Sequence, residues 1–161
     1  MTGSEQVGSL REHLLELLRG RGAHATFEDV TADWPEALRG VKPKRLPYTP
    51  WQILEHMRIA QWDIVEFSIN PRHVSPDYPD GYWPASVEPR SAEDWDSSMH
   101  LFTADLGRMK ALVEDRSLDL FAPFSHGTGQ TLLREAMLLA DHNAYHLGQL
   151  VVLRRLLGVW Y

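Results

Sequence analysis

The 161-residue chain has 43% hydrophobic and 24% charged residues, ordinary values for a globular protein, so we expect one domain over residues 1–161. Its net charge of −6 argues against nucleic-acid binding, which relies on clustered lysine and arginine, and its lack of cysteine excludes disulfides and thiolate ligands. No apolar run approaches the length of a membrane span and the N-terminal residues lack a secretory pattern, so we expect a cytoplasmic protein with no membrane partner.

The first predicted helix covers residues 4–19, where apolar side chains recur at the helical spacing of 3.6 residues. Ser4 is a candidate N-cap and Gly20 a stop signal. The pattern then weakens, although Thr26 is placed to cap a short helix from Phe27 to Ala32. Three prolines mark residues 40–50 as a surface connection.

A second helix is predicted from Pro50 to Ser68, because Thr49 suits the N-cap and a proline at the first helical position loses no hydrogen bond. His56 interrupts the apolar face of this helix. Gln52 and Asp63 share that face, which makes both side chains candidates to hydrogen-bond to the imidazole or to a bound water.

The connection over residues 70–89 holds five of the ten prolines together with Tyr78, Tyr82 and Trp83. A connection of this length in a compact domain is typical of a functional loop, and we expect it to cover one end of the bundle. A third helix is predicted from Ser91, as N-cap, to about Asp115. Residues 116–129 form a second connection, in which we expect a loop or capping role for His126.

The last predicted helix runs from Gln130 to about Leu157, and its histidines dominate the sequence. His142 and His146 lie four residues apart and therefore stack on one helical face, in positions where a core helix would carry leucines. The opposite face is also apolar, with small residues at Ala140 and Ala144, so either another helix or a second subunit must cover it. Four such helices without a credible strand predict an all-α four-helix bundle.

Burying two neighbouring imidazoles is unfavourable unless their nitrogens are satisfied, and a metal ion bound through neutral nitrogens would satisfy them. An i, i+4 pair provides two of the three ligands of an open zinc site, and His56 is the candidate third.

The metalloprotease motif does not fit, because Asn143 stands where that motif has glutamate. Di-iron bundles do not fit either, since no histidine follows a glutamate by three residues. The alternative interpretation is that hydrogen bonds alone satisfy these histidines.

The sequence resembles the DinB/YfiT-like superfamily of small metal-binding four-helix bundles along nearly its whole length. The resemblance rests on Pro50-Trp-Gln-Ile-Leu-Glu-His-Met, on Trp83-Pro84 at the end of the aromatic loop, and on Thr131-Leu-Leu-Arg-Glu through Asp141-His-Asn-Ala-Tyr-His-Leu-Gly-Gln149. It implies an up-down-down-up bundle, frequent homodimers, and a divalent metal on His56, His142 and His146. Despite the family name, it does not imply DNA binding.

The resemblance also implies a metal-dependent hydrolase, or a transferase or isomerase that uses a low-molecular-weight thiol with a small-molecule substrate. Zinc is the first expectation, and three imidazoles would also accept nickel or iron. Candidate supporting residues lie on the same helical faces as the histidines: Asp63, Glu135 and Gln149. Tyr82 and Trp83 of the long connection are candidates to shape the pocket. The competing hypothesis is a non-enzymatic module whose histidines merely hold two helices together.

Overall fold

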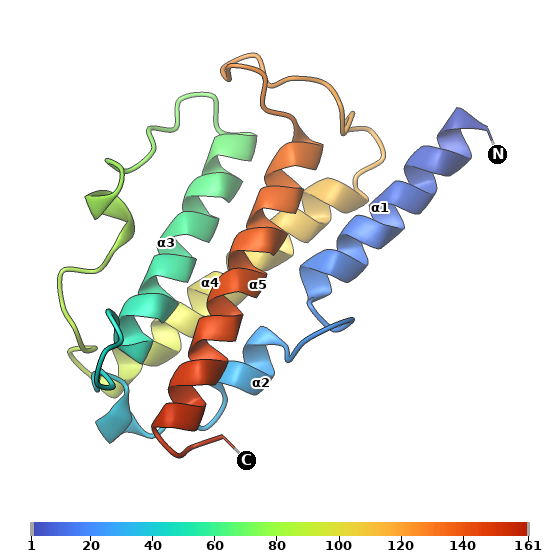
Figure 1. Ribbon diagram of the computed structural model, residues 1–161. Helices are drawn as coiled ribbons and strands as arrows, with labels where there is room; N and C mark the ends of the chain where they lie inside the picture. Colours follow the sequence, from blue (N-terminus) through green and yellow to red (C-terminus); the bar gives the residue numbers. More distant parts are fainter. Residues whose placement is uncertain (1, 161) are drawn as a thin grey trace.

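The computed structural model describes residues 2–160, and within them the chain is helical and has no strand (Figure 1). An isolated β-bridge joins Pro123 and Thr131. The described helices, with two short 3-10 turns labelled η, are α1 (Gly3–Arg19), α2 (Phe27–Thr31), η1 (Glu36–Leu38), α3 (Pro50–Ile69), η2 (Asp80–Tyr82), α4 (Ala92–Glu114) and α5 (Leu132–Leu156). The predicted all-α class is confirmed.

Local capping interactions set the helix starts. The Thr49 hydroxyl accepts from the Gln52 backbone N–H and the Gln52 side chain accepts from the Thr49 backbone N–H, so α3 begins where it was predicted. Gln52 is thus engaged by the cap and not by His56, contrary to one expectation. Thr2, not Ser4, caps α1, because Glu5 at the third helical position completes the reciprocal pair.

The long helices pack around one core, and the apolar back of α5 is covered from within the chain. Figure 1 shows α1 and α5 running in one direction and α3 and α4 in the opposite one. A small crevice is lined by Leu17 and Leu18 of α1 together with Ala140 and Ala144 of α5. The neighbour of these small residues is therefore a helix of the same bundle. The most deeply buried large side chains include Trp95, Phe102, Ile53, Leu54, Met57, Met109, Leu120, Leu139 and Leu150.

The connection between α3 and α4 runs back along the side of α3 instead of covering one end of the bundle (Figure 1). The reason is geometric, because α3 and α4 run in the same direction and the chain must return over a 20-residue helix, about 30 Å. The connection thereby reaches the face of α3 that carries His56. None of the described helices combines the length and the apolar character needed to cross a membrane.

A buried arginine joins the last turn of α5 to the end of α2. Arg154 is 8% exposed, and its guanidinium donates to the backbone oxygens of Val30, Ala32 and Val159. The same group lies over the ring of Trp34, 5.2 Å from its centroid. This cluster fixes the end of α5 below the histidines.

We predict that Arg154→Met lowers the free energy of unfolding by about 2–4 kcal/mol, because buried carbonyl oxygens lose their charged donor. Denaturant titration followed by circular dichroism measures the change. Arg155→Met, at the exposed neighbouring position, is the matched control and should change stability by less than about 0.5 kcal/mol. Equal losses in the two variants would contradict this role for Arg154.

Candidate metal centre

Three imidazoles from two helices converge at one point between α3 and α5. His56 comes from the second turn of α3, and His142 and His146 come from consecutive turns of α5. The Nε2 atom of His56 lies 3.1 Å from Nε2 of His142 and 3.1 Å from Nε2 of His146. One nitrogen from each ring lies within 4.8 Å of the others, so this group could hold a metal ion.

The outer nitrogens of two rings are fixed by carbonyl acceptors. His56 Nδ1 donates to the backbone oxygen of Tyr82 at 2.9 Å, and His146 Nδ1 donates to Oε1 of Gln149 at 2.8 Å. A carbonyl oxygen can only accept, so both rings carry their proton on Nδ1 when neutral. Their Nε2 atoms therefore face the common point with free lone pairs, as metal-binding histidines do.

Hydrogen bonding among the rings cannot satisfy all three nitrogens. His142 Nδ1 is buried and has no partner in the described part of the chain. No acceptor therefore holds the ring proton of His142 on Nδ1, and the proton can lie on Nε2 and be donated to His56. That single proton would serve one of the two 3.1 Å contacts and leave His56 and His146 facing each other as two acceptors. A cation at the centre would satisfy both contacts.

The spacing of the nitrogens suits a small divalent ion. Two Zn–N bonds of about 2.0–2.1 Å at a tetrahedral angle place their nitrogens roughly 3.3 Å apart. The two Nε2 separations of 3.1 Å are close to that value. The donor set of three neutral imidazoles also fits zinc, nickel or iron, so the ligands alone do not select the metal.

The environment keeps the three rings neutral. Burial, together with the neighbouring His146 and His56, lowers the pKa of His142 from 6.5 to about 3. Burial also lowers the pKa of His146 to about 4, although the hydrogen bond to Gln149 opposes this effect. The pKa of His56 is lowered by burial, against the opposing effect of its hydrogen bond to the Tyr82 carbonyl. Neutral nitrogens are the form that binds a metal.

An aromatic stack holds the His56 ring from the side. Trp83 lies parallel to His56, with centroids 4.0 Å apart and planes 3° apart, and Tyr48 stacks on Trp83 at 4.0 Å. Trp83 comes from the long connection and Tyr48 from the segment before α3. The two segments therefore fix the orientation of the α3 histidine from outside the helix.

The three histidines lie in the wall of a cavity of about 610 Å³, a size suited to a small-molecule ligand. The connection between α3 and α4 forms much of the other wall. The remaining lining residues are Tyr48, Ala60, Asp63, Ile64, Tyr78, Pro79, Tyr82, Trp83, Leu138, Tyr145 and Gln149.

A hydrogen-bonded network ties the connection to α3. Asp63 accepts from Tyr82 Oη at 2.7 Å and from His73 Nε2 at 2.7 Å. Burial, and then the neighbouring Asp63, raises the pKa of Tyr82 to about 12, so its hydroxyl stays a neutral donor at neutral pH. Because the Tyr82 backbone oxygen accepts from His56, Asp63 supports that histidine indirectly and not by direct contact.

Comparison with known proteins identifies the family of this chain. The family model described as the DinB superfamily matches residues 7–150, most of the chain. The chain belongs to the DinB superfamily. Comparison with curated proteins and with solved structures gave no match.

The other candidate residues of this DinB-superfamily chain take separate roles. Glu135 is buried and pairs with Arg134 at 2.6 Å, outside the lining of the histidine cavity. Burial raises the pKa of Glu135 against the opposing effect of Arg134. His126 donates to the backbone oxygen of Phe67, a capping role at the end of α3. The sequence spacing did not indicate a role for His73, because only the path of the loop brings His73 to its partner Asp63.

We predict that Gln149→Leu weakens zinc binding by about 10–100-fold, the usual cost of losing the hydrogen bond that orients a ligand histidine. Competition against a chromophoric chelator measures the affinity. Gln149→Glu is the matched control, because its carboxylate can still accept from His146 Nδ1 and should keep most of the affinity. If both variants bind zinc like the unsubstituted protein, Gln149 does not orient a ligand.

We also predict that the metal-free DinB-superfamily protein loses stability as the pH falls from 7 to 5. The folded protein keeps His142 neutral down to about pH 3, whereas the unfolded chain takes up that proton near pH 6.5, so acid favours unfolding. His142→Leu should shrink the stability difference between pH 7 and pH 5 by about 2 kcal/mol. Urea titrations with chelator present measure it.

His100→Leu removes a histidine from an exposed position on α4 and serves as the control for that experiment. If His142→Leu and His100→Leu change the pH dependence equally, the burial of His142 does not control it.

Proposed function

We propose that this DinB-superfamily protein is a divalent-metal-dependent enzyme that acts on a small molecule as a hydrolase or as a thiol-dependent transferase. The observation that carries the proposal is the convergence of three Nε2 atoms in the wall of a cavity large enough for a substrate. Histidine ligands from one side leave coordination positions open toward that cavity, as in catalytic and not in structural zinc sites.

A divalent ion held there would supply Lewis acidity, lowering the pKa of a bound water or thiol and polarising a substrate oxygen. The chain contributes the surroundings. Gln149 and the Tyr82 carbonyl orient two ligand rings, and Trp83 shields His56 from solvent. Asp63 is the one carboxylate among the described lining residues, which makes it the candidate proton acceptor.

The choice between the two reaction types depends on the nucleophile. The chain has no cysteine, so a thiol mechanism requires the thiol to arrive as a cosubstrate. The family resemblance supports a low-molecular-weight thiol, and water is the nucleophile of the hydrolase alternative. Zinc is our first choice of metal, with nickel or iron as alternatives.

The alternative of a metal-stabilised structural module finds less support in the packing. The core includes Trp95, Phe102, Met109 and Leu150, which lie outside the cavity lining, so the bundle has apolar burial independent of the histidines. The up-down-down-up order and a homodimer, both implied by the family resemblance, belong to the same proposal. The helix directions in Figure 1 support the first.

We predict that purified protein contains about one divalent metal ion per chain and that His146→Ala loses most of it. The variant should still fold, with a thermal midpoint close to that of the metal-containing parent protein, because the core does not need the metal. Elemental analysis and calorimetry measure the two quantities. His100→Ala, at an exposed position, should keep the metal. Unfolding of His146→Ala would favour the structural module.

We predict that a panel of hydrolase and thiol-transfer substrates reveals an activity that needs the metal. Rates measured with and without small thiols on zinc-, nickel- and iron-loaded protein separate the two reaction types. Asp63→Asn should lower kcat by about 10²–10⁴-fold if Asp63 transfers a proton. A panel activity that persists in His146→Ala would be independent of the proposed centre.

A further inference from the structure

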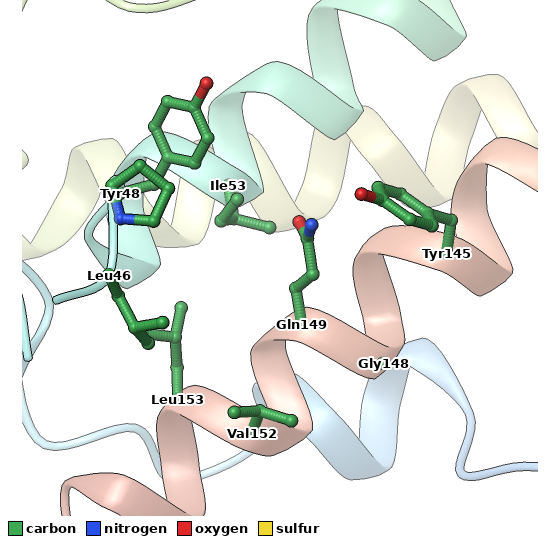
Figure 2. A pocket seen from close by; sticks show the side chains of 9 residues that line it. Leu46, Tyr48, Ile53, Tyr145, Gly148, Gln149, Val152 and Leu153 are labelled. Atoms are coloured by element: carbon green, nitrogen blue, oxygen red, sulfur yellow. The ribbon is translucent and has the colours of Figure 1, made fainter.

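A second cavity adjoins the histidine cavity along α5. It has a volume of about 250 Å³ and lies between the segment before α3, the start of α3 and the last turns of α5 (Figure 2). Three of its residues, Tyr48, Tyr145 and Gln149, also line the histidine cavity. We call this second cavity the apolar annex; its other lining residues are Leu46, Pro47, Ile53, Gly148, Val152 and Leu153.

The annex is suited to an uncharged group. No charged side chain occurs among its lining residues, and Ile53 and Leu153, 1% and 3% exposed, form rigid apolar parts of its wall. An apolar cavity of about 150 Å³ is large enough to bind benzene. At about 250 Å³, the annex has room for an aryl ring with a substituent or for a medium-length alkyl chain.

One of the shared side chains, Gln149, also contacts the metal centre directly. Gln149 accepts from His146 Nδ1 through Oε1, and Figure 2 shows its amide end between Ile53 and Tyr145 at the edge of the annex. A molecule bound at the histidines can therefore reach the annex across the border formed by Tyr48, Tyr145 and Gln149. This continuity favours a substrate group over a separate ligand.

We propose that the substrate is amphipathic, with a polar reacting end at the three histidines and an uncharged aryl or alkyl group in the apolar annex. The inference rests on the proposed function, since it assigns a substrate class to the same centre. Apolar contact in the annex then selects among substrates that share the same reacting group, and the lining residues act as specificity determinants.

Gly148 provides a variant that fills the annex without disturbing the fold. A Cβ atom built at Gly148 meets no other atom within 4 Å, and the helix of α5 favours leucine over glycine. Gly148→Leu should therefore place its side chain in the annex space. Gly107→Leu, on α4, has the same open surroundings and is the matched control.

The test uses two hydroxamates, which share a metal-chelating head and differ in their tail. Isothermal titration of the zinc-loaded protein compares acetohydroxamate with octanohydroxamate. Each methylene that enters the annex should tighten binding by about fourfold. A tail that places three methylenes in the annex should therefore bind about 60-fold more tightly than acetohydroxamate. Gly148→Leu should reduce this gain to less than about threefold and keep the acetohydroxamate affinity, and Gly107→Leu should keep the full gain.

The outcomes separate the two proposals. If zinc or acetohydroxamate does not bind, the proposed function is wrong and the substrate assignment is overturned with it. If acetohydroxamate binds and octanohydroxamate gains nothing, or gains equally in Gly148→Leu, only the annex proposal is overturned. A change of oligomeric state in Gly148→Leu by sedimentation velocity, with no tail gain in the parent protein, would show that a second copy of the chain occupies the annex.

Discussion

The mutual contact of three imidazole nitrogens is the constraint on which the rest of the site depends. Two rings have their protons committed to outward acceptors, so their inner lone pairs face each other at 3.1 Å in a nearly buried place. Such a contact is unfavourable between bare acceptors and favourable around a cation. The Tyr82 carbonyl, Gln149 and Trp83 all act to keep the rings in this arrangement.

The parallel course of α3 and α4 brings the long connection to the histidines. Because both helices run the same way, the connection must return along α3, and its residues Tyr82 and Trp83 contact Asp63 and His56 of that helix. Asp63 fixes the connection at two points, through His73 and Tyr82. A topological requirement of the bundle thus supplies the cavity wall, the acceptor for His56 and the ring stacked on it.

The cavity and the annex divide the surroundings of the centre by chemistry. The histidine cavity carries the ionisable groups, including Asp63, whereas the annex presents apolar side chains and no charge. Gln149 belongs to both, since its carbonyl oxygen orients His146 and its side chain borders the annex. Substrate orientation and metal geometry would therefore be linked through a single residue of α5.

The sequence by itself determined the features that arise within one helix. Periodicity and caps placed α3 and α5 within two residues of their observed limits, and the i, i+4 spacing placed His142 and His146 on one face. The apolar face around His56 made it only a candidate third ligand, and the family resemblance then assigned it, because no local signal relates residues 86 and 90 positions apart.

Only the tertiary structure decided which polar partners meet. In the structure Gln52 caps a helix, Asp63 accepts hydrogen bonds from His73 and Tyr82, and Glu135 pairs with Arg134. Of these candidate residues, only Gln149 hydrogen-bonds to a histidine of the centre. A position on the same face of a helix predicts the direction in which a side chain points, but a hydrogen bond needs contact within about 3 Å. For these residues that contact was set by a loop or a neighbouring helix, whose path the residue pattern does not encode.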